Sequence, residues 1–416
     1  MQVLENHSVA VSEGRILALV PRVQAQADYT AAKHVSLPRH ALIPGMINLH
    51  THAAMNLLRG FADEQPFAQW HQNRIWPMEA KHISPRFVHD GTLLACAEML
   101  RGGITCFNDM YFYPGDAARA ALAVGMRAAL GLVVIDAPTA YASDADDYIA
   151  KGLGLRDVLR EHELLTFCIA PYVPHAVSDK TLSRLITLAE ELDLPVHMHV
   201  HETQDEIKRD LAAHGVRPLE RLHGLGLVGP NLIAVHAVHL NPSEIALFAQ
   251  NGSSVAHCPS SNLKLASGFA PVASMLDQGL TVGLGTDGAA SNNRLDMFQE
   301  MRLAALLAKA VSGNASALPA HRALSMATLD GARALRMEHA IGSIEPGKFA
   351  DLAAIEFAAP QMLPSYDPIS SIVYAAGREN VTDVWVAGRA LVEDRTLKVP
   401  GKNDLESLNI LWQNRF

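Results

Sequence analysis

The middle of this chain alternates eight short apolar stretches with helix-like stretches between most of them. Short apolar runs bounded by turn residues are typical of strands buried in a parallel sheet. Amphipathic stretches such as "SDKTLSRLITLAEELD" predict helices between them. The strands are expected at "ALIPGMINLH", "GITCFNDMY", "MRAALGLVVI", "LTFCIAP", "LPVHMHV", "LIAVHAV", "SSVAHCP" and "LTVGLGTD". Eight such units predict an α/β protein built as a (β/α)8 TIM-type barrel.

Both ends of the chain differ from this middle and read as short strands separated by turns. "HSVAVSEGRILALV" alternates around the turn "SEGR", and "VTDVWVAGRALVED" does so around "AGR". A period of two favours strands with one buried face. We therefore expect residues 1–46 and 342–416 to form one small β-sandwich domain, with the barrel over residues 47–341.

Charge and composition argue against several classes of protein. The 416 residues carry a net charge of −9 without a dense Lys or Arg block, so neither nucleic acid nor an anionic membrane is an expected partner. No apolar run approaches the length of a membrane span, and "MQVLENHSVAV" lacks the pattern of a signal peptide. The four cysteines are scattered, as expected for reduced, buried thiols in a cytoplasmic protein.

Most of the expected strands end in histidine or in an acidic residue, and TIM-type barrels carry their chemistry at this C-terminal rim. Side chains two residues apart on a strand point the same way, so His50 and His52 can converge, as can His197 and His199. Six of the eight strands bring His or Asp to the rim, which packing alone does not explain. The rim candidates are Asn108, Asp109, Tyr172, His175, His201, Glu202, His236, His239, His257 and Asp287, besides the four histidines above.

Several imidazoles with one carboxylate form a ligand set suited to zinc or to iron(II). A catalytic metal keeps one position for water and lowers the pKa of that water towards neutrality, which makes hydroxide available at ambient pH. A free carboxylate nearby, such as Glu202, can then transfer protons. The rim therefore predicts hydrolysis at a trigonal carbon.

Several motifs of the chain resemble those of the amidohydrolase superfamily. They are "PGMINLHTH", "HMHVHET", "AVHAVHL", "NLKLASGFAPV" and "LGTDGAASNN". Within the superfamily the chain resembles the ATZ/TRZ-like 5-methylthioadenosine/S-adenosylhomocysteine deaminase family, which is related to chlorohydrolases. The resemblance covers nearly the whole chain, including "GSIEPGKFADL" in the expected β domain. Relatives usually have an extra strand before "ENHSVAV", so either the start of the chain or the edge of the small domain differs.

The resemblance implies a role for each matching rim residue. The expected ligands of one zinc ion, with iron(II) as the alternative metal, are His50, His52, His199 and Asp287. Glu202 is expected to protonate the substrate ring, His236 to orient the attacking water, and Asp287 to help deprotonate that water. Binuclear relatives bridge two metals through a carboxylated lysine after the fourth strand, and "LTFCIAPYVPHAV" has no lysine, which favours one metal.

The resemblance also implies substrate contacts. Glu79 matches a carboxylate that binds the ribose hydroxyls, although a surface carboxylate is the simpler alternative. Ser291 is expected near the purine or as a helix cap, and Trp76 is expected to line the pocket or to pack. The family usually reads A-P-H-A-P-Y after the fourth strand, whereas "APYVPHAV" exchanges the two types, with Tyr172 and His175. This exchange either preserves the purine contacts or shifts specificity.

Simpler roles are expected for other residues near the rim. His197 is expected to face the barrel interior, and His239 and His257 to orient the ligands or to make ordinary hydrogen bonds. Arg59 and Asp63 are expected to pair in a loop over the site.

The activity implied by the resemblance is hydrolytic deamination of an adenine nucleoside to its inosine analogue, with release of ammonia. We expect 5′-methylthioadenosine and adenosine to be better substrates than S-adenosylhomocysteine, because "GLVVIDAPTAYASDADD" has aspartates and no Arg or Lys for the homocysteine carboxylate. Arg59, Arg74 or Arg294 would change this substrate preference if it extended from another loop to the homocysteine carboxylate. The alternatives are a deaminase of free purine or pterin bases, an s-triazine hydrolase, and a non-catalytic binding relative. A homo-oligomer, dimer or tetramer, is also implied.

Overall fold

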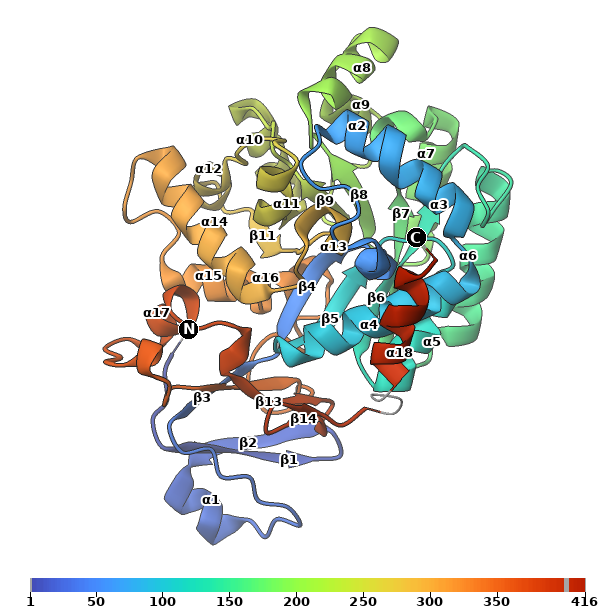
Figure 1. Ribbon diagram of the computed structural model, residues 1–416. Coiled ribbons are helices and arrows are strands. Elements are labelled where there is room, and N and C mark those ends of the chain that lie inside the picture. Colours follow the sequence, from blue (N-terminus) through green and yellow to red (C-terminus); the bar gives the residue numbers. More distant parts are fainter. Residues whose placement is uncertain (1, 400–403, 416) are drawn as a thin grey trace.

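The computed structural model describes residues 2–399 and 404–415, and its larger part is a parallel eight-stranded barrel (Figure 1). The strands follow one another around the barrel in chain order. They are β4 (Met46–Thr51), β5 (Ile104–Asp109), β6 (Arg127–Val134), β7 (Leu165–Pro171), β8 (Val196–Val200), β9 (Leu232–His236), β10 (Ser254–His257) and β11 (Thr281–Leu284). Each of the eight expected stretches contains one of these strands, so the predicted barrel is confirmed.

The barrel nearly closes where β11 meets β4. The backbone N–H of Asp287 donates to the carbonyl oxygen of His50 at 2.9 Å, just beyond the end of β11. Gly285 permits this approach, because a Cβ there would lie 2.8 Å from the backbone nitrogen of His50. The absence of a side chain at Gly285 therefore brings the last strand end against the first metal-ligand candidate.

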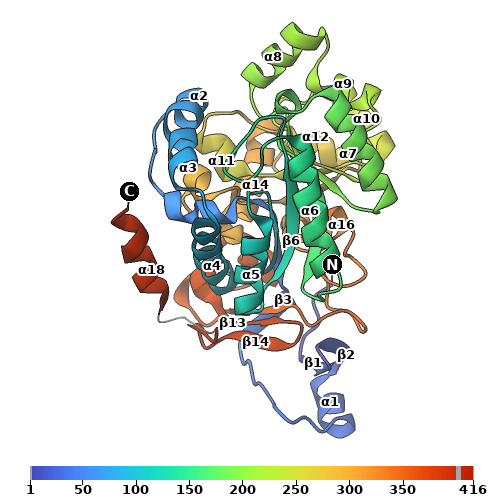
Figure 2. The ribbon, with the colours of Figure 1, turned by 90° about the vertical axis from the view of Figure 1, so that its right-hand side faces the viewer.

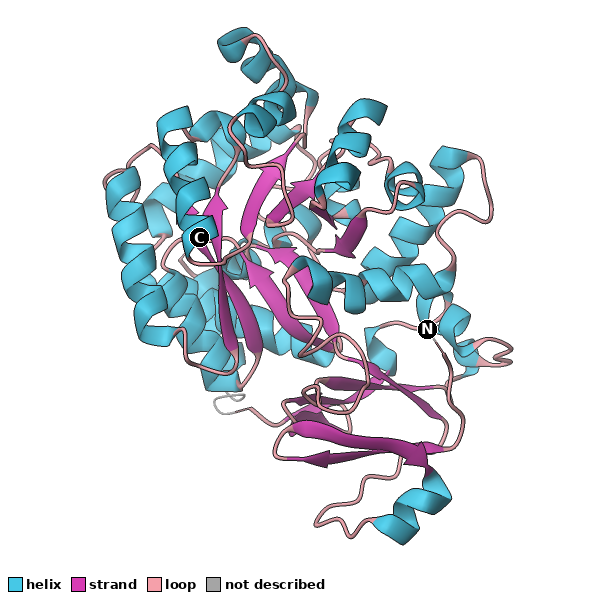
Figure 3. Cartoon of the chain, turned by 180° about the vertical axis from the view of Figure 1, so that it is seen from behind, coloured by secondary structure: helices cyan, strands magenta, loops and turns pink. Residues whose placement is uncertain are grey.

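Helices cover the outside of the barrel (Figures 2 and 3). The first half contributes α4 (Pro85–Arg101), α5 (Pro114–Val124), α6 (Ala145–Leu159) and α7 (Asp179–Glu191). The second half contributes α8 (Gln204–His214), α9 (Pro218–Gly224), α10 (Pro242–Asn251), α12 (Val272–Asp277), α14 (Met297–Ser312), α15 (Ala320–Met326) and α16 (Leu329–Ala334). The short helices α11 (Pro259–Lys264) and α13 (Ala289–Asn292) follow the C-terminal ends of β10 and β11 and contact each other at the rim. In α7, Ser178 caps the N-terminus, and Leu182, Leu185 and Ala189 are buried at helical spacing.

A helical segment between β4 and α4 lies over the C-terminal end of the strands (Figure 1). It consists of η1 (Ala53–Leu58), α2 (Phe67–Trp70), η2 (His71–Ile75) and α3 (Trp76–His82). The element η2 is a π-helix, a rare conformation that often occurs at functional sites.

The small domain at the other end of the barrel contains two antiparallel sheets drawn from both ends of the chain (Figure 1). The larger sheet has the order β15 (Thr396–Leu397), β14 (Arg389–Glu393), β13 (Val381–Val386), β12 (Leu352–Glu356) and β3 (His40–Pro44). The smaller is the hairpin of β1 (His7–Ser12) and β2 (Arg15–Pro21). Ile16 of the hairpin packs in one buried cluster with Leu352 of the larger sheet.

Three helices depart from the purely β-stranded ends that the sequence predicts. Residues Arg22–Asp28 form α1, which contains no buried residue. The helices α17 (Pro368–Tyr374) and α18 (Asp404–Gln413) pack against barrel helices instead of extending a sheet. In α18 the indole N–H of Trp412 donates to Asp90 of α4 at 3.0 Å. The domain boundaries at residues 46 and 342 remain a prediction.

Among the residues that the structure describes, no helix combines the length and the apolar character needed to cross a membrane.

Candidate metal centre

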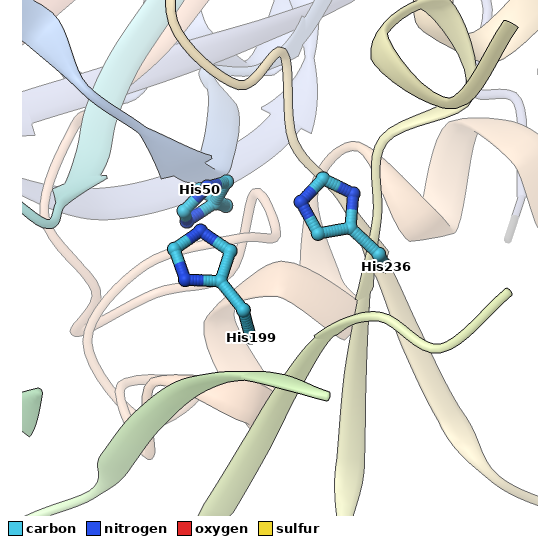
Figure 4. A group of neighbouring side chains, drawn as sticks. All are labelled: His50, His199 and His236. Carbon is cyan, nitrogen blue, oxygen red and sulfur yellow. The ribbon is translucent and has the colours of Figure 1, made fainter. Parts of the chain in front are cut away.

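Five buried side chains from four strand ends converge inside the C-terminal rim. Figure 4 shows the imidazoles of His50, His199 and His236 pointing toward one another from β4, β8 and β9. Ligand atoms of these three lie within 4.8 Å of one another, and the same holds for His50, His52 and Asp287. The Nε2 atoms of His50 and His52 each lie 3.4 Å from Oδ1 of Asp287. The structure thus brings together every residue that the sequence predicts as a metal ligand.

Each of the four imidazoles uses its Nδ1 atom in a hydrogen bond away from the centre. The partners are Nε2 of His197 for His50 (2.9 Å), the carbonyl oxygen of Met110 for His52 (2.5 Å), the carbonyl oxygen of Tyr172 for His199 (2.7 Å) and Oδ1 of Asn262 for His236 (2.8 Å). Such bonds fix the ring orientation and leave Nε2 for a metal. Within the described chain, the buried Nε2 of His50 has no hydrogen-bond partner. An orphaned nitrogen between a carboxylate and other imidazoles fits a metal ion.

The electrostatics of the cluster also suit a divalent metal. Burial lowers the pKa of His50 to about 4, and burial with neighbouring histidines keeps that of His199 well below its usual value. Burial alone would raise the pKa of Asp287, but the close approach of His50 and the charges of nearby histidines hold it well below the ordinary range. Neutral imidazoles and an ionised carboxylate are the forms that bind zinc.

The backbone is left-handed where several strands end at this site. His201, His236 and Asp287 have φ angles of 54°, 69° and 60°. Non-glycine residues adopt this region only where surrounding structure compensates for the strain, and such residues cluster at functional sites. Here the turn redirects the chain at the strand end and aims the His236 and Asp287 side chains inward.

Glu202 follows β8 and lies beside the cluster. Its Oε1 atom is 3.9 Å from Nε2 of His236. Burial, reinforced by the charge of Asp287, raises the pKa of Glu202 to about 8, so the carboxyl group is protonated at neutral pH. The carboxylate of Glu206 accepts the backbone N–H groups of His201 and Glu202, both at 2.8 Å, and fixes the loop that presents Glu202.

Glu79 is buried, so the interpretation of it as a surface carboxylate is wrong. It lies on α3 with 8% of its surface exposed and accepts a hydrogen bond from the Tyr111 hydroxyl at 2.7 Å. Burial raises the pKa of Glu79 to about 7, although the Tyr111 bond opposes this. The Tyr111 ring lies 6.2 Å from that of His52, which connects Glu79 to the metal cluster.

Tyr172 and His175, the exchanged pair after the fourth strand, have different environments. The Tyr172 ring lies 5.0 Å from that of His199, and burial, together with the charges of Glu79, Glu202 and Asp287, raises the pKa of its hydroxyl. Tyr172 therefore lies beside the metal cluster. His175 is exposed on η3 (Pro174–Ala176), where it lines a cavity of about 540 Å³. Contact of these residues with a purine remains a prediction.

The structure excludes one of the two expected roles of Ser291 and of Trp76: helix capping for Ser291 and packing in the core for Trp76. The Ser291 hydroxyl donates to the carbonyl oxygen of Gly288 at 3.0 Å. Gly288 is the N-cap of α13 and Asp296 that of α14, so the capping role of Ser291 is wrong. The Trp76 side chain is 56% exposed, so it is not a core residue, and its ring lies 4.9 Å from that of His71. Substrate contact by Ser291 and Trp76 stays a prediction.

The expected pairing of Arg59 with Asp63 is wrong. Arg59 pairs with Glu98, whereas Asp63 accepts hydrogen bonds from Lys264 at 2.6 Å and from Asn293 at 2.6 Å. Partners from elements distant in the sequence, Glu98 on α4 and Lys264 on α11, take the place of the local neighbour.

Among the described residues, neither of the two histidines considered as ligand-orienting residues forms a hydrogen bond with the metal cluster. His239 bonds Gln204 at 2.9 Å and the carbonyl oxygen of Ser267 at 2.8 Å. His257 is buried, and burial lowers its pKa to about 3. The positions that do bond the cluster through side chains are His197, which faces the barrel interior as expected, Ser261 and Asn262.

A parallel barrel with buried histidines and a carboxylate at its C-terminal rim defines a metal-dependent hydrolase. The model of the Amidohydrolase family matches residues 41–391, and the chain belongs to that family. A 5-methylthioadenosine/S-adenosylhomocysteine deaminase of Teredinibacter turnerae is 46% identical over 98% of this chain and 92% of its own length. A protein of the same name from Thermodesulfovibrio yellowstonii is 40% identical over 100% of this chain and 95% of its own length.

Solved structures agree with this assignment. An adenosine deaminase from Xanthomonas campestris with bound zinc has a TM-score of 0.98 and 48% identity, covering 99% of this chain and 94% of that one. The zinc-bound atrazine chlorohydrolase TrzN of Arthrobacter aurescens shares the fold, with a TM-score of 0.92 and 22% identity over 98% of this chain and 95% of that one. The donor set of the cluster fits the same metal, one zinc ion.

Proposed function

We propose that this protein is a zinc-dependent deaminase that converts the 6-amino group of an adenine nucleoside to the oxo group of the inosine analogue. The observation that carries the proposal is the buried Glu79, whose hydrogen-bond partner Tyr111 lies beside His52 of the metal cluster. With its pKa raised to about 7, Glu79 is partly ionised at neutral pH, and the ionised form can accept two hydrogen bonds from a vicinal diol, which favours a nucleoside over a free base. The zinc-bound adenosine deaminase at 48% identity and the relatives named as deaminases support it.

In this proposal His50, His52, His199 and Asp287 bind the zinc ion. One zinc ion would supply a water ligand whose pKa lies near neutrality. His236 directs Nε2 at the space between Glu202 (3.9 Å) and Asp287 (4.0 Å), where it orients the attacking water. Asp287 accepts a proton from that water.

Glu202 supplies the other proton transfer. Because its pKa is raised to about 8, it carries a proton at neutral pH and can donate it to the ring nitrogen beside the amino-bearing carbon. The water oxygen adds to that carbon, and the proton taken by Asp287 passes to the amino nitrogen. The bond to that nitrogen breaks and ammonia leaves, while the remaining hydroxyl proton returns to Glu202 and the ring nitrogen keeps the proton that it received. One water is consumed, and the inosine analogue and ammonia are released.

Substrate preference follows from the charges near the third barrel strand. The loop after β6 has no cation, and two of the three arginines that could reach in have partners, since Arg59 pairs with Glu98 and Arg294 with Asp296. Lys151 of α6, which donates to the carbonyl oxygen of Tyr141 in this loop, is paired with Asp147, so a homocysteine carboxylate finds no unpaired cation there. We propose that 5′-methylthioadenosine and adenosine are better substrates than S-adenosylhomocysteine.

The test uses zinc-loaded protein with these three nucleosides, followed by the ultraviolet change from adenine to hypoxanthine and by ammonia release. We expect turnover of the first two and weaker turnover of the third. Turnover of adenine, guanine or an s-triazine, with none of the nucleosides, would contradict the proposal and assign the protein to the base deaminases or triazine hydrolases.

The assembly and the compartment are further proposals. We propose a cytoplasmic homo-oligomer, dimer or tetramer, that binds neither nucleic acid nor membrane. All four cysteines are buried and unpaired, which suits a reducing compartment. Light scattering coupled to size-exclusion chromatography tests the assembly, and a monomer would contradict it.

A further inference from the structure

The short helix α11 carries two adjacent buried polar side chains that both bond to the metal cluster. The Ser261 hydroxyl donates to Oδ2 of Asp287 at 2.6 Å. Oδ1 of Asn262 accepts a hydrogen bond from Nδ1 of His236 at 2.8 Å. Ser261 is 0% exposed and Asn262 2%, so solvent does not compete for either bond.

The Ser261 bond gives the two carboxylate oxygens of Asp287 different surroundings. Oδ1 lies 3.4 Å from Nε2 of both His50 and His52, on the side of the ligand candidates. Oδ2 is bonded by Ser261 and lies 4.0 Å from Nε2 of His236, on the side proposed for the attacking water. Rotation of the carboxylate would exchange these oxygens, and the Ser261 hydroxyl opposes that rotation.

The Asn262 bond selects the tautomer of His236. Because the amide oxygen accepts, the imidazole carries its proton on Nδ1 and presents a lone pair on Nε2. That lone pair faces Glu202 and Asp287 at 3.9 and 4.0 Å. A histidine with the opposite tautomer would present a proton there and could not accept a hydrogen bond from the water that it orients.

The helix itself is anchored at both ends. The backbone N–H of Ser260 donates to Glu300 of α14 at 3.0 Å, an anchor that alanine at this position would keep. At the other end Lys264 bonds Asp63 and the carbonyl oxygen of Ala290 at 2.6 and 2.9 Å. The platform that carries Ser261 and Asn262 is thus held in place independently of the metal cluster.

We propose that Ser261 and Asn262 are positioning residues that fix the two groups flanking the attacking water, Asp287 and His236, from one helical turn. The inference rests on the proposed function for the roles of Asp287 and His236. Since the two residues are adjacent, a movement of α11 would displace both groups together.

The experiment compares Ser261→Ala and Asn262→Ala with Ser260→Ala, a buried serine on the same helix whose hydroxyl bonds Gln299 instead of the cluster. Zinc affinity is measured by chelator competition, and the metal environment by the visible spectrum of the cobalt(II)-substituted protein. Loss of such supporting bonds typically costs about 10- to 100-fold in metal affinity or activity. We expect weakened zinc binding and an altered cobalt spectrum for Ser261→Ala, a lower kcat at similar KM for Asn262→Ala, and neither change for Ser260→Ala.

Two conservative variants keep the test decisive if truncation impairs folding. Ser261→Thr retains the hydroxyl and Asn262→Asp retains the acceptor, so both are expected to recover most of the lost function. Alanine variants that match Ser260→Ala in zinc affinity, cobalt spectrum and kcat would overturn the proposal. The metal measurements need no substrate, so they stand even if the wild-type protein fails to deaminate any nucleoside.

Discussion

Glu79 combines burial, a tyrosine partner and proximity to the metal cluster in one carboxyl group. We expect Glu79→Gln to raise the KM for adenosine by about 10- to 100-fold, because hydrogen bonds to a charged group contribute about 1.5–3 kcal/mol. The kcat should change far less. Steady-state kinetics with 2′,3′-dideoxyadenosine, which lacks the diol, provide the control, and an equal loss with both nucleosides would contradict the ribose contact.

The same carboxyl group makes stability depend on pH. Burial raises the pKa of Glu79 from 4.5 to about 7, so the folded protein favours the protonated form. The stabilisation is complete below about pH 4.5 and is lost as the pH rises through 7, by about 3 kcal/mol in total. Urea unfolding of the metal-free wild type and of Glu79→Gln should show that the free energy of unfolding of the wild type falls relative to that of the variant between pH 4.5 and about 7. A constant difference between them would argue against a raised pKa of Glu79 in the folded protein.

At the scale of elements, the barrel strands and the polar residues at their ends could be predicted, because short apolar runs indicate the strands and the polar residues directly follow these runs. His50 and His52 lie two residues apart at the end of an apolar run, and side chains at that spacing on a strand point the same way. The supporting residues Ser261 and Asn262 were not predictable, because their partners Asp287 and His236 each lie 26 positions away. A serine or asparagine in a short helix has no periodic signature, so only the folded barrel reveals its contact.

The junction of β11 with β4 gives a prediction for an element boundary. Gly285→Ala would place a Cβ 2.8 Å from the backbone nitrogen of His50 and 2.9 Å from its Cβ, so the strand ends must separate. We expect a loss of about 1–3 kcal/mol in stability together with weaker zinc binding. Gly154→Ala in α6, where a new Cβ meets nothing within 4 Å, is the matched control and should bind zinc normally. Normal zinc binding by both variants would contradict this account of the junction.

At the scale of the whole molecule, a buried ion pair connects the barrel with the small domain. Arg127 at the start of β6 donates to both carboxylate oxygens of Asp351, at 2.8 and 3.1 Å. Asp351 also accepts the backbone N–H of Ala387 at 2.8 Å. The sequence predicts that both chain ends share a domain, yet a pair 224 positions apart leaves no local pattern. How the domain attaches therefore depends on tertiary structure.

This pair should control stability and leave the chemistry intact. Asp351→Asn removes the charge opposite a guanidinium that is 1% exposed, and breaking one side of a buried pair typically costs about 3–5 kcal/mol. We expect a lower unfolding midpoint with zinc content and kcat of the folded protein unchanged, because Arg127 begins β6 at the end opposite the catalytic rim. Asp146→Asn, which breaks the exposed pair with Arg184, is the control and should cost less than about 1 kcal/mol. Equal stability of the two variants would show that the domains are held by apolar packing alone.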